Sequence, residues 1–208
     1  LLREEARPGK VVAVAGGTTV AAVAEMMAPS PQLKETTFVP ARGGLGEAVE
    51  LEANYIASLM AKKTGGSYRL MHVPDQLSEE TYRTVIREPH IREVLELLKT
   101  ARIAVHGIGG AMEMAARRKS SPELLRHLRE TDAVGEAFGY YFNRRGEIVH
   151  KMKTVGIQLD DLQRMERIIS VAGGASKADA IAAFCAVACR DTLITDEGAA
   201  RAILASES

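Results

Sequence analysis

Four glycine pairs in this sequence each follow a short apolar run and precede a stretch with helical periodicity. The pairs are Gly16-Gly17, Gly43-Gly44, Gly109-Gly110 and Gly173-Gly174. Glycine lets the backbone turn sharply and approach a ligand closely. The first N–H groups of a helix lack partners and carry a partial positive charge. Several such helix ends at one edge of a sheet would bind an anion, and phosphate is the commonest candidate.

Polar side chains beside these turns favour the same chemistry. The hydroxyl groups of Thr18 and Thr19 can donate hydrogen bonds to a phosphate. Arg42 ends an apolar run, where its guanidinium could hold a phosphate in a bidentate fork. Lys177 follows a glycine pair at the start of a helix, and a cation there is unfavourable unless an anion is bound. We therefore expect these four side chains in a phosphate site.

Two carboxylates are candidate acceptors for sugar hydroxyl groups. Glu136 opens an aromatic segment, and both ligand contact and a structural salt bridge are open for it. Glu52 is expected one turn into a helix over residues 48–63. The neighbouring Arg117 and Arg118 end another helical pattern, and one of them could contact a ligand if they are not simply solvated.

The glycine pairs also have a plainer interpretation as tight strand-to-helix turns. Four pairs in the same position favour a ligand site over that interpretation. A Gly-x-Gly-x-x-Gly sequence is absent after the first apolar run, and there is no Gly-Lys-Ser/Thr sequence. A small phosphorylated molecule is therefore favoured over a dinucleotide or a triphosphate.

Six short apolar runs predict the strands that would position these residues. They cover residues 11–15, 37–42, 68–73, 102–106, 168–172 and 192–195. Runs without alternation are typical of strands buried on both faces, as in a parallel sheet, and the helical patterns between them supply the crossovers. The predicted fold class is α/β, a doubly wound parallel sheet with helices on both faces.

One stretch, residues 133–154, interrupts this alternation. Residues 136–143 and 148–151 predict a β-hairpin around a polar turn at 144–147, which would extend or cover one edge of the sheet. Asp160 and Asp161 are expected to cap a helix that begins near Leu162. No shift in composition marks a second domain, so residues 1–208 are expected to form one domain.

Composition limits the functional classes that remain. The chain has 208 residues, of which 46% are hydrophobic, and its 27 basic residues balance 27 acidic ones. Such a chain has no broad attraction for nucleic acid or anionic lipid, and no apolar run is long enough for a membrane span. Cys185 and Cys189 share a helix face and are expected to be buried thiols in a reducing cytoplasm. The five histidines show no metal-ligand spacing, so neither a metal nor a cofactor is expected.

Five motifs resemble the C-terminal effector domain of SorC-type bacterial transcriptional regulators. They are Gly16-Gly17-Thr18-Thr19 and the segments 39–46, 105–109, 171–177 and 195–199. Two further segments, 135–143 and 155–161, narrow the resemblance to repressors of glycolytic genes. The resemblance runs over nearly the whole chain.

This resemblance implies a Rossmann-like fold related to sugar-phosphate isomerases and glucosamine-6-phosphate deaminases. It implies that the domain senses a sugar phosphate, with fructose 1,6-bisphosphate as the inducer. It also implies a helix-turn-helix domain, absent from this chain, through which alone operator DNA would be bound. We further expect a homodimer.

The resemblance also assigns site residues. The phosphates would be held by Thr18, Thr19, Arg42, Lys177 and Arg117 or Arg118, with Glu136 on the sugar. The site glycines would be Gly17, Gly43, Gly44, Gly107, Gly109 and Gly174. Glu52 stands where the family often has an amide, and an ionised carboxylate only accepts hydrogen bonds.

Two other functions remain open at this point. One is a sugar-phosphate isomerase or deaminase, which would need a base such as Glu136, Asp160 or Asp161. The chain has no Asp-Gly-Ala-Asp segment of the kind that pentose-phosphate isomerases carry, so we expect no enzymatic activity. The other is a plain interaction domain without a ligand.

Overall fold

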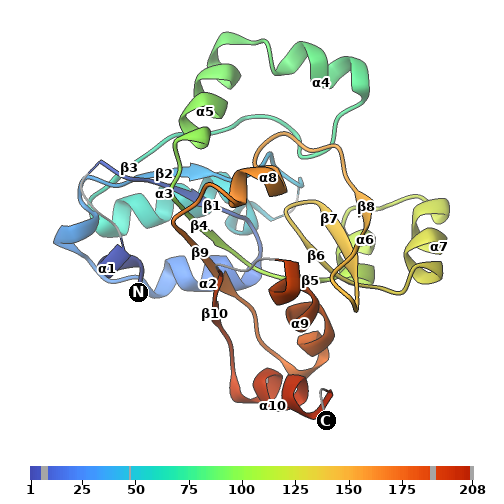
Figure 1. The fold of residues 1–208 in the computed structure, drawn as a ribbon. Helices are drawn as coiled ribbons and strands as arrows, with labels where there is room; N and C mark the ends of the chain where they lie inside the picture. Colours follow the sequence, from blue (N-terminus) through green and yellow to red (C-terminus); the bar gives the residue numbers. More distant parts are fainter. Residues whose placement is uncertain (6–8, 47, 188–190, 207–208) are drawn as a thin grey trace. The chain divides into compact units, whose positions relative to one another are not determined.

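The computed structural model of the chain describes residues 1–5, 9–46, 48–187 and 191–206 (Figure 1). The chain divides into two units, and each unit is built from two segments. Unit 1 comprises Leu1–His106 and Lys153–Ile168, and unit 2 comprises Gly107–Met152 and Ile169–Ser208.

The larger sheet is built from short apolar strands. They are β1 (Val11–Val14), β2 (Thr37–Pro40), β3 (Ser67–Tyr68), β4 (Ile103–His106), β9 (Arg167–Val171) and β10 (Asp191–Ile194). Their order is β10-β9-β4-β1-β2-β3, and β1 pairs in parallel with both β2 and β4. The chain first adds β2 and β3 on one side of β1 and then adds β4, β9 and β10 on the other side. Doubly wound α/β folds have the same change of direction at their central strands. The predicted fold class is confirmed.

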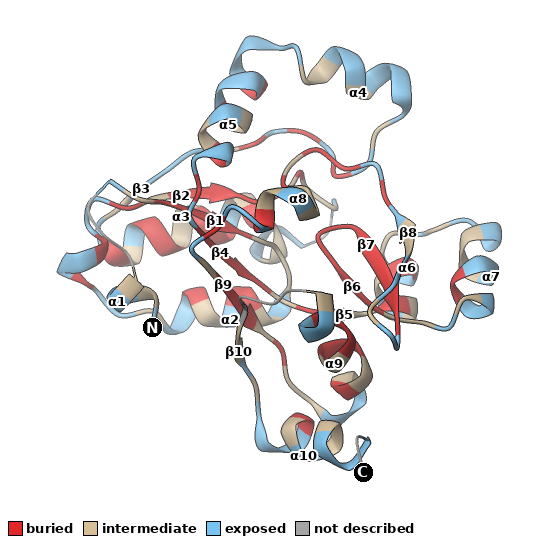
Figure 2. Cartoon of the chain, viewed as in Figure 1, coloured by how far each residue is buried: buried red, intermediate tan, exposed pale blue. Residues whose placement is uncertain are grey.

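Burial explains why these runs lack alternation. All four residues of β1 and all four of β4 are buried, so both faces of these strands are covered (Figure 2). In unit 1, α3 (Ala53–Thr64) and α5 (Pro89–Lys99) pack against β1 and β2. The other elements of this unit are α1 (Leu2–Glu5), α2 (Thr18–Met26), η1 (Pro31–Leu33), η2 (Val49–Leu51), α4 (Glu79–Val85) and α8 (Leu159–Leu162).

The strand predicted over residues 68–73 is mostly wrong, because β3 contains only Ser67 and Tyr68. After β3, hydrogen bonds from a side chain take the place of hydrogen bonds to a neighbouring strand. The Asn54 Oδ1 accepts from the amide of Met71 at 2.8 Å, and Asn54 Nδ2 donates to the carbonyl of Met71 at 3.0 Å. The backbone there is satisfied by a helix side chain and needs no neighbouring strand.

The stretch predicted as a hairpin forms part of a second, antiparallel sheet in unit 2. Its strands are β5 (Gly109–Gly110), β6 (Ala133–Ala137), β7 (Tyr140–Asn143) and β8 (Ile148–Lys151), in the order β5-β6-β7-β8. The hairpin of β7 and β8 is confirmed, but it does not extend the six-stranded sheet. The expected first strand is also broken by a turn at Phe138 and Gly139, which have φ angles of 53° and 84°. Two successive positive φ angles are typical of tight hairpin turns.

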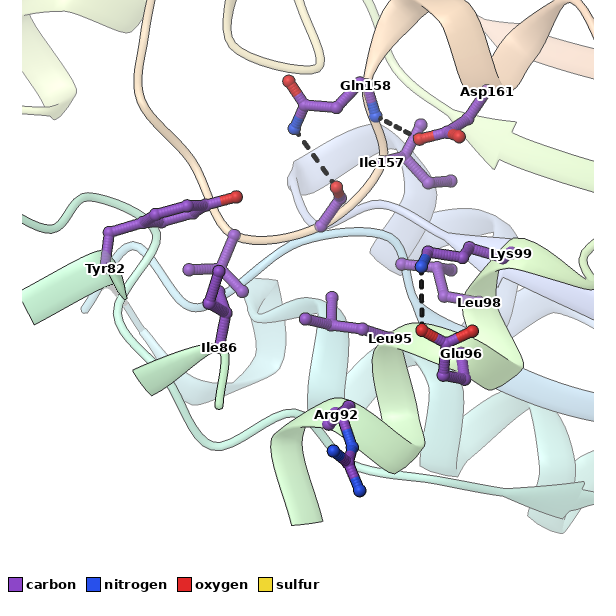
Figure 3. Close-up of a pocket in the computed structure, with 12 residues that line it drawn as sticks. Tyr82, Ile86, Arg92, Leu95, Glu96, Leu98, Lys99, Ile157, Gln158 and Asp161 are labelled. Carbon is purple, nitrogen blue, oxygen red and sulfur yellow. Dashed lines mark hydrogen bonds and ion pairs between the residues drawn. The ribbon is translucent and has the colours of Figure 1, made fainter. Parts of the chain in front are cut away.

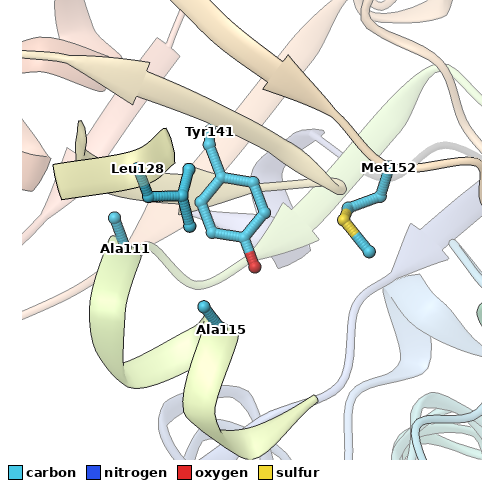
Figure 4. Close-up of a cluster of buried hydrophobic side chains, with 5 residues drawn as sticks. All are labelled: Ala111, Ala115, Leu128, Tyr141 and Met152. Carbon is cyan, nitrogen blue, oxygen red and sulfur yellow. The ribbon is translucent and has the colours of Figure 1, made fainter. Parts of the chain in front are cut away.

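Unit 2 also contains α6 (Ala111–Arg117), α7 (Pro122–Glu130), η3 (Ala175–Lys177), α9 (Ala178–Val187) and α10 (Glu197–Ser206). A cluster of buried side chains joins α6, α7 and β7 (Figure 4). Its members are Ala111, Ala115, Leu128, Tyr141 and Met152. The cluster fixes α6 and α7 against the antiparallel sheet.

Two local predictions need correction. Cys185 is exposed on α9 and is not a buried thiol, while Cys189 lies outside the described residues. The short helix α8 begins at Leu159 and is capped by Gln158, not by Asp160. Asp161 completes that cap, because its carboxylate accepts from the Gln158 amide at 2.8 Å.

Candidate functional site

The turn between β1 and α2 leaves a helix N-terminus open to solvent. Gly17 has a φ of 113°, a conformation that L side chains rarely adopt, and its N–H donates to the carbonyl oxygen of Leu51 at 2.8 Å. The amides of Thr18 and Thr19 have no acceptor in the described part of the chain, and Thr18 is exposed. This N-terminus can therefore accept an anion.

The same turn lies where doubly wound sheets place their ligands. β1 is flanked by β2 and β4, and the chain direction around the sheet changes between β1 and β4. Ligands of such folds bind outside the carboxyl ends of the strands at this position. Gly17, Thr18 and Thr19 follow the carboxyl end of β1, as predicted.

Arg42 follows β2, but its guanidinium is already engaged inside unit 1. The Nε atom donates to Oδ1 of Asp75 at 2.9 Å, and Nη2 donates to Oδ2 at 2.5 Å. The side chains of Arg42 and Asp75 are 11% and 2% exposed. Asp75 was not identified from the sequence, although its position indicates a site residue. It is an acidic residue that follows the apolar run at 68–73 directly after Pro74.

The glycine pair after β2 serves close packing. The amide of Gly43 donates to the carbonyl of Val155 at 3.0 Å, and the amide of Gly44 donates to the carbonyl of Val73 at 2.9 Å. A Cβ atom on Gly43 would lie 2.6 Å from the carbonyl oxygen of Pro74. Both amides are thus used within unit 1, and a role of either glycine in ligand binding stays a prediction.

Glu52 was predicted to lie one turn into a helix, and this is wrong. It is the N-cap residue of α3 and has an extended backbone. Its Oε2 accepts from the amide of Leu45 at 3.2 Å, next to Gly44. Its neighbour Leu51 accepts from Gly17. The dipeptide 51–52 therefore holds the turn after β1 and the turn after β2.

In unit 2, Glu136 forms a buried ion pair with Arg118. Arg118 Nη2 donates to Oε1 of Glu136 at 3.0 Å, and the two side chains are 2% and 5% exposed. The same Oε1 accepts from the amide of Gly139 at 2.6 Å, and Arg118 Nη1 donates to the Tyr141 hydroxyl at 3.2 Å. The structural salt bridge left open by the sequence is present, and its partner is Arg118. Ligand contact by Glu136 or by Arg117 stays a prediction.

The third glycine pair is not a simple strand-to-helix turn. Gly109 and Gly110 form β5, and Gly109 pairs with Glu136 of β6. A Cβ atom on Gly109 would collide with the Met114 side chain. A side chain at this position would therefore require Met114 to move, and ligand contact by Gly107 or Gly109 stays a prediction.

The turn after β9 leads to a cation, Lys177. Gly174 has a φ of 96°, and its amide donates to Oδ2 of Asp196 at 2.6 Å. Lys177, at the end of η3, is half-buried, and its ammonium has no ion-pair or hydrogen-bond partner within the described residues. Hydrogen bonds from the backbone amides of Ala199 and Gly174 lower the pKa of Asp196. Asp196 was not identified as a site residue from the sequence, although it lies in a motif of the resemblance.

Comparison with known proteins agrees with this fold. Residues 1–205 match the family model Sugar-bind, described as "Putative sugar-binding domain". A crystal structure described as that of "the putative SorC family transcriptional regulator from Enterococcus faecalis" superposes with a TM-score of 0.91 at 48% identity. That match covers 98% of this chain and 83% of the other. The chain belongs to the sugar-binding domain family of SorC-type regulators.

Two curated relatives of this SorC-type domain are named central glycolytic genes regulator. The protein of Priestia megaterium is 58% identical over 93% of this chain, and that of Bacillus subtilis is 53% identical over 95%. The chain covers 56% and 58% of their respective lengths. These relatives are transcriptional regulators and not enzymes.

Unit 1 of the SorC-type domain also contains a pocket of about 430 Å³, lined by α4, α5 and residues 155–161 (Figure 3). Three of its charged side chains are engaged locally, because Lys99 pairs with Glu96 at 2.8 Å and Asp161 accepts from the Gln158 amide. None of the predicted ligand residues lines it. Its lining residue Gly156 pairs with Arg42, so the pocket adjoins a predicted ligand residue that does not itself line it.

The described residues contain neither a candidate metal cluster nor a candidate membrane-spanning helix. No group of three or more His, Cys, Asp or Glu side chains in that part of the SorC-type domain could hold a metal ion. None of its helices has the length and apolar character that crossing a membrane requires.

Proposed function

We propose that this SorC-type domain binds a sugar phosphate and thereby controls a transcriptional regulator of glycolytic genes. Membership of a sugar-binding family supports a sugar as the ligand. The names of the relatives from Priestia megaterium and Bacillus subtilis support glycolytic genes as the target of regulation. Fructose 1,6-bisphosphate is the proposed effector, as the resemblance implies. The proposed regulator is a cytoplasmic homodimer, and it binds operator DNA through a domain outside this chain.

The observation that carries the proposal is the open N-terminus of α2. The Gly17 turn leaves the amides of Thr18 and Thr19 without acceptors among the residues that the structure describes, and Thr18 is exposed. Such a helix end stabilises a phosphate through hydrogen bonds and through the helix dipole. We assign the first phosphate contact in unit 1 to these groups.

Further contacts are proposed for each unit by itself. In unit 2, the ammonium of Lys177, which has no partner among the described residues, would bind an anionic group beside the Gly174 turn. Arg42 and Glu136 would act with Asp75 and Arg118 still bound to them, so that their orientations are fixed before the effector arrives. Preorganisation of this kind lowers the entropic cost of binding.

The switch itself would be a population shift. An effector that binds one arrangement of the regulator better than another moves the population toward that arrangement, and a coupling of about 1–3 kcal/mol is typical. The effector would in this way change how the homodimeric regulator assembles on its operator.

Calorimetric titration tests the proposal. Thr18→Val and Lys177→Gln should each weaken the affinity for fructose 1,6-bisphosphate about tenfold, the factor expected for the loss of one charge-assisted contact. Lys99→Gln, which removes an exposed lysine of α5, should leave the affinity unchanged. In thermal-shift measurements, fructose 1,6-bisphosphate should raise the melting temperature more than fructose 6-phosphate, glucose 6-phosphate, dihydroxyacetone phosphate or inorganic phosphate.

The proposal fails if fructose 1,6-bisphosphate stabilises the domain no more than inorganic phosphate. Unchanged affinity in both variants would instead remove the site assignment. A better response to another sugar phosphate would replace the effector and leave the site in place.

A further inference from the structure

The segment between β10 and α10 contains an aspartate with two separate tasks. Asp196 precedes α10, and its Oδ1 accepts from the amide of Ala199 at 2.8 Å. Its Oδ2 accepts from the amide of Gly174 at 2.6 Å. One oxygen thus caps the last helix, and the other anchors the glycine turn after β9.

The anchored turn leads directly to Lys177. Gly174 precedes η3, and its carbonyl accepts from the amide of Lys177 at 2.9 Å. A Cβ atom on Gly173 would collide with Oδ2 of Asp196, so the carboxylate lies directly against the turn. η3 also packs against α10 and α9, all within unit 2.

We propose that Asp196 is a positioning residue for effector binding, which fixes the Gly174 turn so that Lys177 is held ready for an anionic ligand. The inference rests on the proposed role of Lys177. Asp196 is exposed and acts through the turn without contacting the ligand. A turn that is already ordered binds with less entropic cost than one that must be ordered by the ligand.

Electrostatics alone would have the opposite effect. A carboxylate near an anion site repels the ligand, so removing its charge would by itself strengthen binding. An aspartate is ordinarily ionised at neutral pH, and hydrogen bonds from the amides of Ala199 and Gly174 lower the pKa of Asp196 further. The direction of the affinity change therefore separates positioning from simple charge.

Asp196→Asn separates the two tasks of the side chain. Asparagine is as good an N-cap as aspartate, and its single carbonyl oxygen can still accept from Ala199. The second oxygen becomes an NH₂ group, which is a donor and cannot accept from the Gly174 amide. The variant keeps the cap of α10 and loses the anchor of the turn.

Titration with fructose 1,6-bisphosphate and thermal unfolding test the inference together. Asp196→Asn should weaken binding about tenfold, because only a fraction of the molecules then holds the turn in its binding arrangement. Its melting temperature should stay near that of the wild type. Asp196→Ala should lose as much affinity and also melt earlier. The proton resonance of the Gly174 amide should shift upfield in both variants, because a short hydrogen bond to a carboxylate is lost.

Two matched controls accompany these variants. Ser121→Ala removes the N-cap of α7 in the same unit, where Ser121 accepts from the amide of Leu124 at 3.3 Å. It should lower stability and leave affinity unchanged. Glu197→Gln removes a negative charge from the adjacent residue, whose carboxylate pairs with Arg201 at 2.6 Å, and should also leave affinity unchanged.

Equal or tighter binding by Asp196→Asn, with Lys177→Gln still weakening binding, would overturn this inference and leave the proposed function intact. If Lys177→Gln also binds normally, the assignment of Lys177 fails, and the inference fails with it. A loss of affinity in Ser121→Ala equal to that in Asp196→Asn would show that stability alone accounts for the effect.

Discussion

At the scale of single residues, two of the charged side chains expected to hold ligand, Arg42 and Glu136, already have charged partners. Arg42 pairs with Asp75 in unit 1, and Arg118 pairs with Glu136 in unit 2. Removing one partner of a buried pair leaves an uncompensated charge, which costs more than the pair contributes. Substitutions at these positions therefore change folding as well as binding.

Asp75→Ala should lower the free energy of unfolding by about 3 kcal/mol, because the Arg42 guanidinium would remain buried without its carboxylate. Urea unfolding measures this loss. Glu96→Gln breaks an ion pair whose side chains are 60% and 62% exposed, and should change stability by less than about 0.5 kcal/mol. The double variant Arg42→Met, Asp75→Leu should recover much of the loss, since no charge is left buried. Equal effects of Asp75→Ala and Glu96→Gln would contradict the importance of the buried pair.

The sequence shows Asp75 as an acidic residue after an apolar run, but it does not reveal that Asp75 pairs with Arg42. Asp75 lies 33 residues from Arg42, and backbone contacts such as the pairing of Gly44 with Pro74 bring it close. The side chains of Thr18 and Lys177 could be identified, because each follows a glycine pair that itself follows a buried strand. The amides of Gly43 and Gly44 could not, since their acceptors, Val155 and Val73, come from distant loops.

At the scale of elements, α7 and β8 bring two histidines together. The ring centroids of His127 and His150 are 6.1 Å apart, and the Tyr141 ring lies 5.9 Å from that of His150. Burial lowers the pKa of His150, and the charge of His127 lowers it further. The folded unit therefore favours the neutral form of His150.

This arrangement predicts a loss of stability in acid. Below the ordinary histidine pKa of about 6.5, the unfolded chain binds a proton at His150 that the folded chain resists, so the free energy of unfolding falls as the pH decreases. Urea unfolding between pH 7.5 and 5.5 should show this decline in the wild type, and a smaller decline in His150→Gln. Parallel pH profiles for the two proteins would show that His150 does not contribute.

The same scale shows which elements a sequence can predict. Strands such as β1 and β4 are buried on both faces, and a continuous apolar run predicts them well. The run at 136–143 was wrongly predicted as one strand because Phe138 is apolar yet adopts a positive φ. In that turn the Gly139 amide donates to the Glu136 carboxylate, a contact that the local pattern alone does not reveal.

At the scale of the whole molecule, positive and negative charges balance, so binding of an anion depends on individual groups. The formal net charge is zero, with 27 basic and 27 acidic residues. A chain without net positive charge gains little from releasing counterions along DNA. Anion binding must then come from specific groups such as the α2 N-terminus, and not from a general surface field.

This charge balance predicts that the chain alone does not bind DNA. In fluorescence anisotropy at 150 mM salt, a random labelled duplex should show no binding at micromolar protein, with or without fructose 1,6-bisphosphate, because few phosphates can be neutralised. Salt-sensitive binding in the micromolar range would contradict this expectation and would place a DNA-contacting surface within these 208 residues.

The dipeptide Leu51-Glu52 constrains how such a domain can diverge. The carbonyl of Leu51 accepts from Gly17 in the turn after β1, and the carboxylate of Glu52 accepts from Leu45 in the turn after β2. A mutation that shifts this dipeptide alters both turns together, whereas a mutation in one turn is restrained by the unchanged contact with the other. New effector preferences should therefore arise in evolution more readily through residues 51 and 52 than through either turn alone.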